Sequence, residues 1–173
     1  HGDAGATAPR RETGSLAGSG SVAWTHKLDA NWSARGTVEA GWTDYDESYS
    51  ADLDQLALTG KAAVIWRPFA DRSSVSAEVE YGRIDAELDR LSYDRYGFEL
   101  RGRWAIDDVN TIDATASYTG RTYWAEFGEE EPFAREDDRW EASISYTRTV
   151  APGVGLYVKT GYIINDSNIA SET

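Results

Sequence analysis

The stretch "WSARGTVEAGW", residues 32–42, decides the fold that we expect for this chain. Small or apolar side chains fill its even positions from Trp32 to Trp42, and polar or charged ones such as Arg35 and Glu39 fill most odd positions. A period of two is typical of an extended strand, whose successive side chains point to opposite faces. One face of this strand is therefore apolar between two tryptophans, and the other face carries charge.

The two tryptophans also set a length. Residues 32 and 42 are separated by ten steps, which at about 3.4 Å each make a strand of roughly 34 Å. Tilted by about 40°, this strand rises by roughly 26 Å, close to the apolar band of about 25 Å in outer-membrane barrels. We therefore interpret Trp32 and Trp42 as the two interface markers of a membrane-crossing strand.

The same alternation recurs along the rest of the chain. Seven further segments carry it: residues 16–26, 55–67, 74–83, 96–106, 111–124, 139–150 and 153–164. No segment keeps the 3.6-residue period of a helix. Short connections alternate with long ones at residues 43–54, 84–94 and 126–138. We predict an all-β chain in which antiparallel up-and-down strands form a transmembrane β-barrel.

The tryptophans support a membrane rather than a soluble core. All seven fall on the apolar face and none at a strand centre, with Trp24, Trp32, Trp66 and Trp104 beside short connections and Trp42, Trp124 and Trp140 beside long ones. A soluble core would place its largest side chains in the middle, whereas a membrane barrel places aromatic residues in two interfacial girdles. We predict that these tryptophans mark the membrane interfaces.

The opposite face is charged in mid-strand. We predict that its charged side chains face the lumen: Arg35, Glu39, Lys61, Glu78, Glu80, Glu99, Arg101, Arg103, Asp113, Arg121, Glu141 and Lys159. Charges of both signs could pair there. The alternative is a soluble ligand-binding β-barrel, in which the charged face is solvated and the apolar face forms the core.

Composition excludes several classes of function. The 173 residues carry a net charge of -13 and contain no cysteine, so we expect neither nucleic-acid binding nor thiolate chemistry. The histidines are His1 and His26, too few for a zinc site or a Ser-His-Asp arrangement. We expect no enzymatic activity, no metal and no cofactor. A mean hydropathy of -0.56 without a long apolar run also argues against a transmembrane helix.

Acidic residues gather in the long connections, which hold sixteen of the thirty Asp and Glu residues. Exposed loops need charge for solubility, and this accounts for much of the pattern. An anionic surface at the outer leaflet would in addition allow divalent cations to bridge it to lipopolysaccharide phosphates. We therefore predict outer-membrane lipid and lipopolysaccharide as partners.

The chain ends suggest further strands. We divide the chain into a loop or flexible segment at residues 1–12, barrel strands at 13–166 and the start of a surface loop at 167–173. The first segment runs towards a short connection and the last runs away from one, so both ends lie on the long-loop side. Bacterial barrels normally have both termini on the short-turn side. We therefore expect these eight strands to belong to a barrel of about ten to fourteen strands.

Three stretches resemble a known family. They are "SYDRYGFELRGRW" at residues 92–104, "RTYWAEFGEEEPFAREDDRWEASISY" at 121–146 and "GYIINDSNIASET" at 161–173. They are similar to the C-terminal β-barrel of surface lipoprotein assembly modifiers, and to related outer-membrane porin-like barrels associated with exopolysaccharide. The resemblance implies a barrel that helps to move lipoproteins to the cell surface, usually behind a periplasmic helical-repeat domain. This sequence shows no such repeat, which leaves the translocator role open.

Three functions follow as expectations. The first is a pore or translocator in the bacterial outer membrane, with a charged lumen and an exported lipoprotein or polysaccharide as cargo. The second is a structural or adhesive outer-membrane anchor with a filled barrel and acidic surface loops. The third is the soluble ligand-binding barrel. Dependence on detergent separates the third from the others, and conductance separates the first two.

Overall fold

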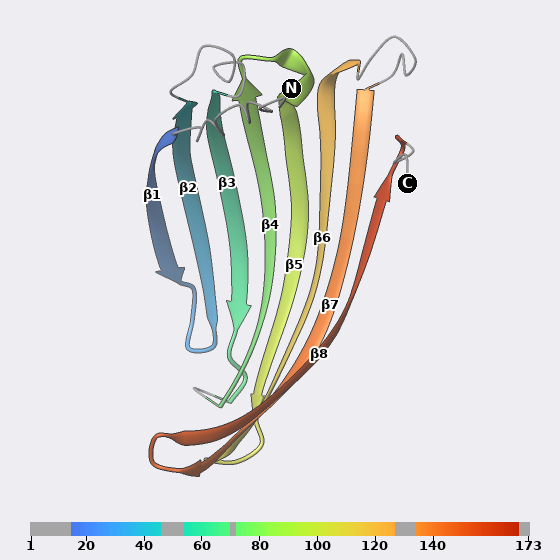
Figure 1. Ribbon diagram of the computed structural model, residues 1–173. Coiled ribbons are helices and arrows are strands. Elements are labelled where there is room, and N and C mark those ends of the chain that lie inside the picture. Colours follow the sequence, from blue (N-terminus) through green and yellow to red (C-terminus); the bar gives the residue numbers. More distant parts are fainter. Residues whose placement is uncertain (1–14, 46–53, 70–71, 127–133, 170–173) are drawn as a thin grey trace, which may run out of the picture.

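The computed structural model describes residues 15–45, 54–69, 72–126 and 134–169, which form one curved sheet (Figure 1). Its strands are β1 (Ser15–Lys27), β2 (Trp32–Tyr45), β3 (Gln55–Trp66), β4 (Ser73–Ala86), β5 (Tyr93–Ala105), β6 (Asn110–Glu126), β7 (Ala134–Ala151) and β8 (Val154–Ser167). They lie in sequence order, and each pairs antiparallel with the next. The predicted all-β, up-and-down arrangement of eight strands is confirmed.

The strand register keeps the apolar and the charged side chains on separate faces across the whole sheet. One row of partners runs through Val22, Val38, Gly60, Tyr81, Tyr96, Gly120, Asp138 and Asp166. Because directly opposite residues share a face, the apolar sets of all eight strands form one continuous surface. The charged sets form the other.

The charged face is the more covered of the two. Along β4 the apolar-face side chains are exposed, and Val79 keeps 59% of its surface, whereas Ile84 on the opposite face keeps 8%. Among the described residues, the buried apolar side chains are Ala63, Ile84 and Ala86, and all three lie on the charged face. The large apolar side chains of the sheet are therefore not packed into a core.

The strands are longer than predicted at the long-loop end. β7 begins at Ala134 rather than residue 139, and β5 begins at Tyr93 rather than residue 96. The expected long connection at 84–94 shrinks to residues 87–92, with a 3-10 helix at Asp89–Leu91. Towards the long loops polar residues stand on both faces of several strands, so the alternation that revealed the strands fades before the strands end.

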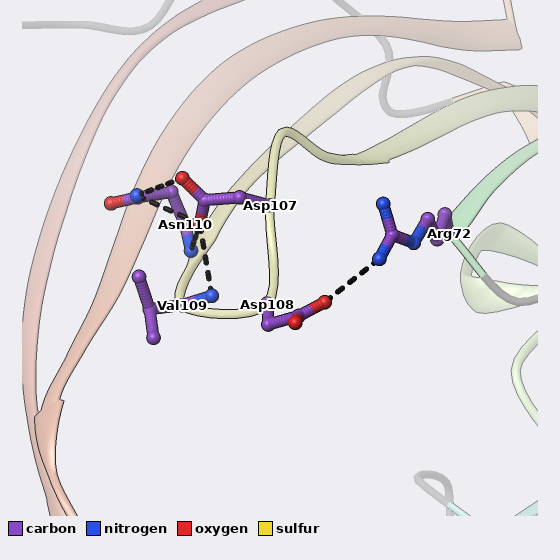
Figure 2. A network of polar contacts seen from close by, with 5 residues as sticks. All are labelled: Arg72, Asp107, Asp108, Val109 and Asn110. Carbon is purple, nitrogen blue, oxygen red and sulfur yellow. Dashed lines mark hydrogen bonds and ion pairs between the residues drawn. The ribbon is translucent and has the colours of Figure 1, made fainter.

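The short connections are closed by aspartate and glycine. Asp29 Oδ1 accepts hydrogen bonds from the backbone N–H of Asn31 and Trp32 at 2.7 and 2.9 Å. Asp107 does the same for the N–H groups of Val109 and Asn110 at 2.9 and 2.8 Å (Figure 2). Gly153 has a φ of 78°, which a glycine adopts without steric cost.

β1 and β8 form the two edges of the sheet and do not pair with each other in the described residues (Figure 1). The sheet is thus open between them. Residues 1–12 of the expected N-terminal segment lie outside the described residues, and Ser167, expected to begin a surface loop, instead ends β8.

Within the described ranges, no helix has the length and apolar character needed to cross a membrane.

Candidate functional site

The charged face brings together all twelve side chains predicted to share it. Register places Arg35 opposite Ala63, Lys61 opposite Glu80, and Glu78 opposite Glu99. It continues through Arg101 and Arg103 on β5 to Asp113 and Arg121 on β6, and then to Glu141 on β7 and Lys159 on β8 by the same alternation. That this face lines a lumen stays a prediction.

Glu80 lies at the centre of an ionic network that joins three strands. Its Oε1 accepts a hydrogen bond from Arg95 Nε at 2.8 Å and lies 2.7 Å from Arg95 Nη2, while its Oε2 lies 3.7 Å from Lys61 Nζ. The Glu80 side chain is only 13% exposed. Gly97, its partner on β5, lies where a side chain has little space, since a Cβ there would lie 2.6 Å from the backbone O of Tyr118 and 3.3 Å from Glu80 Oε1.

The remaining charges pair only in part. Arg101 pairs with Glu99, Arg103 with Asp113 at 4.0 Å, and Glu141 with Arg139 at 3.2 Å. In the part of the chain that the structure describes, no ion pair within 4 Å involves five of the predicted residues: Arg35, Glu39, Glu78, Arg121 and Lys159. The charged face thus carries both ion-paired side chains and side chains that form no ion pair with the described residues.

Two hollows on this face are rich in charged side chains. The smaller one, of about 250 Å³, is lined by Lys61, Glu78, Glu80 and Arg101, among others. A larger one of about 1020 Å³ lies at the long-loop end of β5 to β8 and is lined by Arg95, Arg121, Arg135 and Arg139, among others. Both are built from charged and hydroxyl side chains, so they suit polar solutes rather than apolar ligands.

Three of these arginines were absent from the predicted set. Arg95 and Arg135 lie in strand extensions beyond the predicted segments, and Arg139 lay at the first residue of one. The parity that placed Glu99 and Glu141 also places Arg95 and Arg139 on the charged face, so extending the alternation by a few residues finds them. Arg135 Nε donates to Asp137 Oδ1 at 2.8 Å on the same face.

Tryptophans border the apolar face at both ends. Near the short turns, the Trp32 and Trp66 rings stack with centroids 5.8 Å apart, and Phe69 meets Trp104 edge-on at 5.6 Å. Near the long loops, Tyr118 packs against Trp140 at 4.7 Å. All seven tryptophans share this face, as predicted from their parity; Trp124 does so despite a register shift after Thr122.

At the long-loop end, aromatic side chains of the apolar face contact polar and charged partners. Tyr81 and Tyr118 donate their hydroxyls to Asp94 and Asp138 at 2.9 and 2.6 Å. Trp124 Nε1 donates to Asp94 Oδ2 at 3.2 Å, and the Arg83 guanidinium lies 3.8 Å from the Trp124 ring centre. The apolar face therefore turns polar within a residue or two of its aromatic border.

These aspartates alter the picture of acidic loops. Asp94 and Asp138 lie within β5 and β7 instead of in the long connections where we expected them. They lie on the tryptophan-bearing face, where the tyrosine hydroxyls hold them. Part of the acidity at this end of the sheet is therefore fixed on strands.

No three His, Cys, Asp or Glu side chains of the described ranges are arranged to hold a metal ion. Comparisons with protein-family models, curated proteins and solved structures give no match to the chain. The resemblance to surface lipoprotein assembly modifiers thus stays a prediction.

Proposed function

We propose that the chain forms the wall of a transmembrane β-barrel in the bacterial outer membrane and acts as a pore or translocator, with its charged face towards the lumen. The observation that carries this proposal is the inversion of burial across the sheet. The large apolar side chains are exposed, whereas the buried apolar side chains of the described residues and the 13%-exposed Glu80 lie on the charged face. A lipid bilayer is the environment that accepts such a surface.

The extent of the apolar face supports lipid as its solvent. Val38, Leu58, Val79, Leu100 and Ile144 form its middle, and each keeps about half of its surface exposed, between 46% and 59%. Exposed apolar patches of this continuity are rare on soluble monomers. A soluble barrel would turn the same side chains inwards.

The aromatic borders give the proposed membrane its two levels. Tryptophan and tyrosine favour the interface because an apolar ring is joined to a polar tip. The hydroxyls of Tyr81 and Tyr118 reach towards aspartates at the long-loop end, as they would from the bilayer into the headgroup region. Lipopolysaccharide, bridged by divalent cations, is the partner we propose at this level.

The open edges favour closure into a larger barrel. In hydrocarbon every backbone N–H and C=O needs a partner, so a membrane sheet has no free edge. β1 and β8 are the two edges of the sheet, and their long-loop ends stand apart in Figure 1. This separation supports the proposed barrel of about ten to fourteen strands, within the size range of such proteins.

The first test is whether folding requires detergent or lipid. We expect the full-length protein, with its complete barrel, to fold and stay monodisperse only in detergent micelles or vesicles, and folding in plain buffer would overturn the membrane assignment. Planar-bilayer recordings then test the pore, for which we expect discrete ion currents.

Absence of current from a folded, inserted protein would favour the second candidate, a structural or adhesive anchor with a filled barrel. The network of Glu80 with Lys61 and Arg95 is the observation that supports it, because bridging side chains can fill a narrow lumen.

A further inference from the structure

The larger hollow gathers positive charge in an acidic protein. The chain carries a net charge of -13, yet four arginines line this one space of about 1020 Å³: Arg95, Arg121, Arg135 and Arg139. Thr119, Asn165 and Ser167 add neutral polar groups. The volume matches the largest small-molecule sites.

The carboxylates around the hollow compensate these arginines only in part. Asp137, Asp138 and Asp166 also line it, but the register pairs Asp138 with Gly120 and Asp166, on the face opposite to the arginines. The Asp138 carboxylate accepts the Tyr118 hydroxyl there. Asp137 is the one aspartate of the lining on the arginine face; Arg135 donates to it, and it is also the register partner of Arg121 on β7.

Arg95 and Arg121 face each other across β5 and β6 as direct register partners. Like charges in this position destabilise a sheet. Glu80 compensates Arg95, but no carboxylate oxygen of the described residues lies within 4 Å of Arg121, whose guanidinium lies 5.5 Å from the ring centre of Tyr93. Within the described residues Arg121 has Asp137 opposite it on β7 but forms no ion pair within 4 Å, and a bound anion would relieve its repulsion with Arg95.

Arginine fits one chemical class of ligand. Its planar fork donates two parallel hydrogen bonds to a carboxylate, sulfate or phosphate group. Arg95 and Arg139 hold single acidic partners, and a guanidinium has five N–H donors, so donors remain on both. Arg95, Arg121 and Arg139 together suit a ligand with more than one oxyanion group.

We propose that this hollow binds oxyanion groups of a solute that passes the charged face, which rests on the proposed function of that face as a lumen wall. The site lies at the long-loop end, so a solute entering there meets it first. A positively charged patch at the mouth of a channel concentrates anions by electrostatic steering.

The test uses inorganic pyrophosphate as the probe. The full chain is folded in lipid-free detergent micelles, and binding is measured by isothermal titration at constant ionic strength. We expect Arg121→Gln to weaken binding by about tenfold, since it removes charge-assisted hydrogen bonds. Arg121→Lys keeps the charge but loses the fork, so we expect an intermediate effect.

Arg72→Gln is the matched control, because Arg72 lies at the short-turn end, outside the hollow, and pairs with Asp108 on the surface. We expect its affinity to equal that of the unsubstituted protein. Arg139→Gln serves as a second variant if Arg121→Gln does not fold. No binding by the unsubstituted protein, or equal weakening by Arg72→Gln and Arg121→Gln, would overturn the site.

Two further outcomes separate this site from the pore. Ion current without pyrophosphate binding would support the pore and exclude the oxyanion site. Pyrophosphate binding without ion current would support the oxyanion site and exclude the pore. Vesicles with lipopolysaccharide test a lipid source of phosphate. If lipopolysaccharide displaces pyrophosphate from the protein, the hollow faces the lipid and not the lumen, and this result would contradict the proposal.

Discussion

The indole ring of Trp24 lies directly over Gly36, its register partner on the neighbouring strand. A Cβ built at position 36 would lie 2.0 Å from a ring atom of Trp24, so a side chain there would collide with the ring. Tyr96 covers its partner Gly120 in the same way, with a ring atom 2.5 Å from the added Cβ. Glycine opposite an aromatic residue thus lets the ring lie flat along the apolar face.

Gly36→Ala should therefore destabilise the sheet. We expect a loss of about 1–3 kcal/mol in the free energy of unfolding, since the ring must leave its place. Urea unfolding of the full chain in lipid vesicles measures it. Gly20→Ala is the control, because a Cβ at position 20 meets nothing within 4 Å. Equal losses in the two variants would show that the ring contact contributes nothing.

A second prediction tests which face meets lipid. Val38 lies mid-strand on the apolar face, and Val38→Arg should cost about 2–4 kcal/mol if that face contacts the bilayer centre. The control is Ser21→Arg, because Ser21 precedes Val22, the register partner of Val38, and so lies at the same level of the sheet. Ser21 is on the charged face opposite Glu39, where an added positive charge has a partner. We expect it to be nearly neutral in the same unfolding assay. The reverse order of the two costs would mean that the faces are exchanged.

The sequence was sufficient to predict the strands and their faces, because a period of two survives wherever one face is apolar and the other polar. The Trp32–Trp66 pair and the Lys61–Glu80 pair both follow from that parity once the neighbouring strands are aligned. The strand ends did not follow, since the segment before Trp140 is charged on both faces and resembles a loop. Pairing in the hairpin, rather than local composition, extends β7 back to Ala134.

The charge network was predictable only in outline. Parity placed Glu78 and Glu80 on one face, but it could not distinguish their partners. Register sets Glu80 opposite Lys61 and near Arg95, whereas it sets Glu78 opposite Glu99. Two neighbouring carboxylates on one strand therefore have opposite electrostatic surroundings, and this difference depends on strand alignment.

This contrast gives a third prediction. Glu80→Gln removes a carboxylate that is only 13% exposed and that binds both Lys61 and Arg95, so we expect a loss of about 1–3 kcal/mol in the free energy of unfolding. Glu78→Gln removes repulsion with Glu99 and should be neutral or slightly stabilising. Both variants are measured by urea unfolding in vesicles. A Glu78→Gln loss as large as that of Glu80→Gln would contradict the assigned pairing.

The last prediction concerns the turn between β5 and β6, where two adjacent aspartates differ in role (Figure 2). Asp107 accepts hydrogen bonds from the Asn110 side chain and the N–H groups of Val109 and Asn110, and these hold the pKa of the Asp107 carboxyl below its usual value. Among the described residues Asp108 pairs with Arg72 alone, at 2.9 Å between side chains that are 88% and 65% exposed, and exposed pairs contribute little. Asp107→Ala should therefore lower stability more than Asp108→Ala.

The pH dependence of that difference follows from the sign of the shift. A carboxyl with a lowered pKa in the folded state stabilises it above the unfolded-state pKa of about 4 and ceases to do so as the pH falls through the lowered folded value. Urea midpoints of Asp107→Ala and the unsubstituted chain should thus differ fully at neutral pH and converge below about pH 4. A gap of constant size across this range would show that the Asp107 charge does not stabilise the turn.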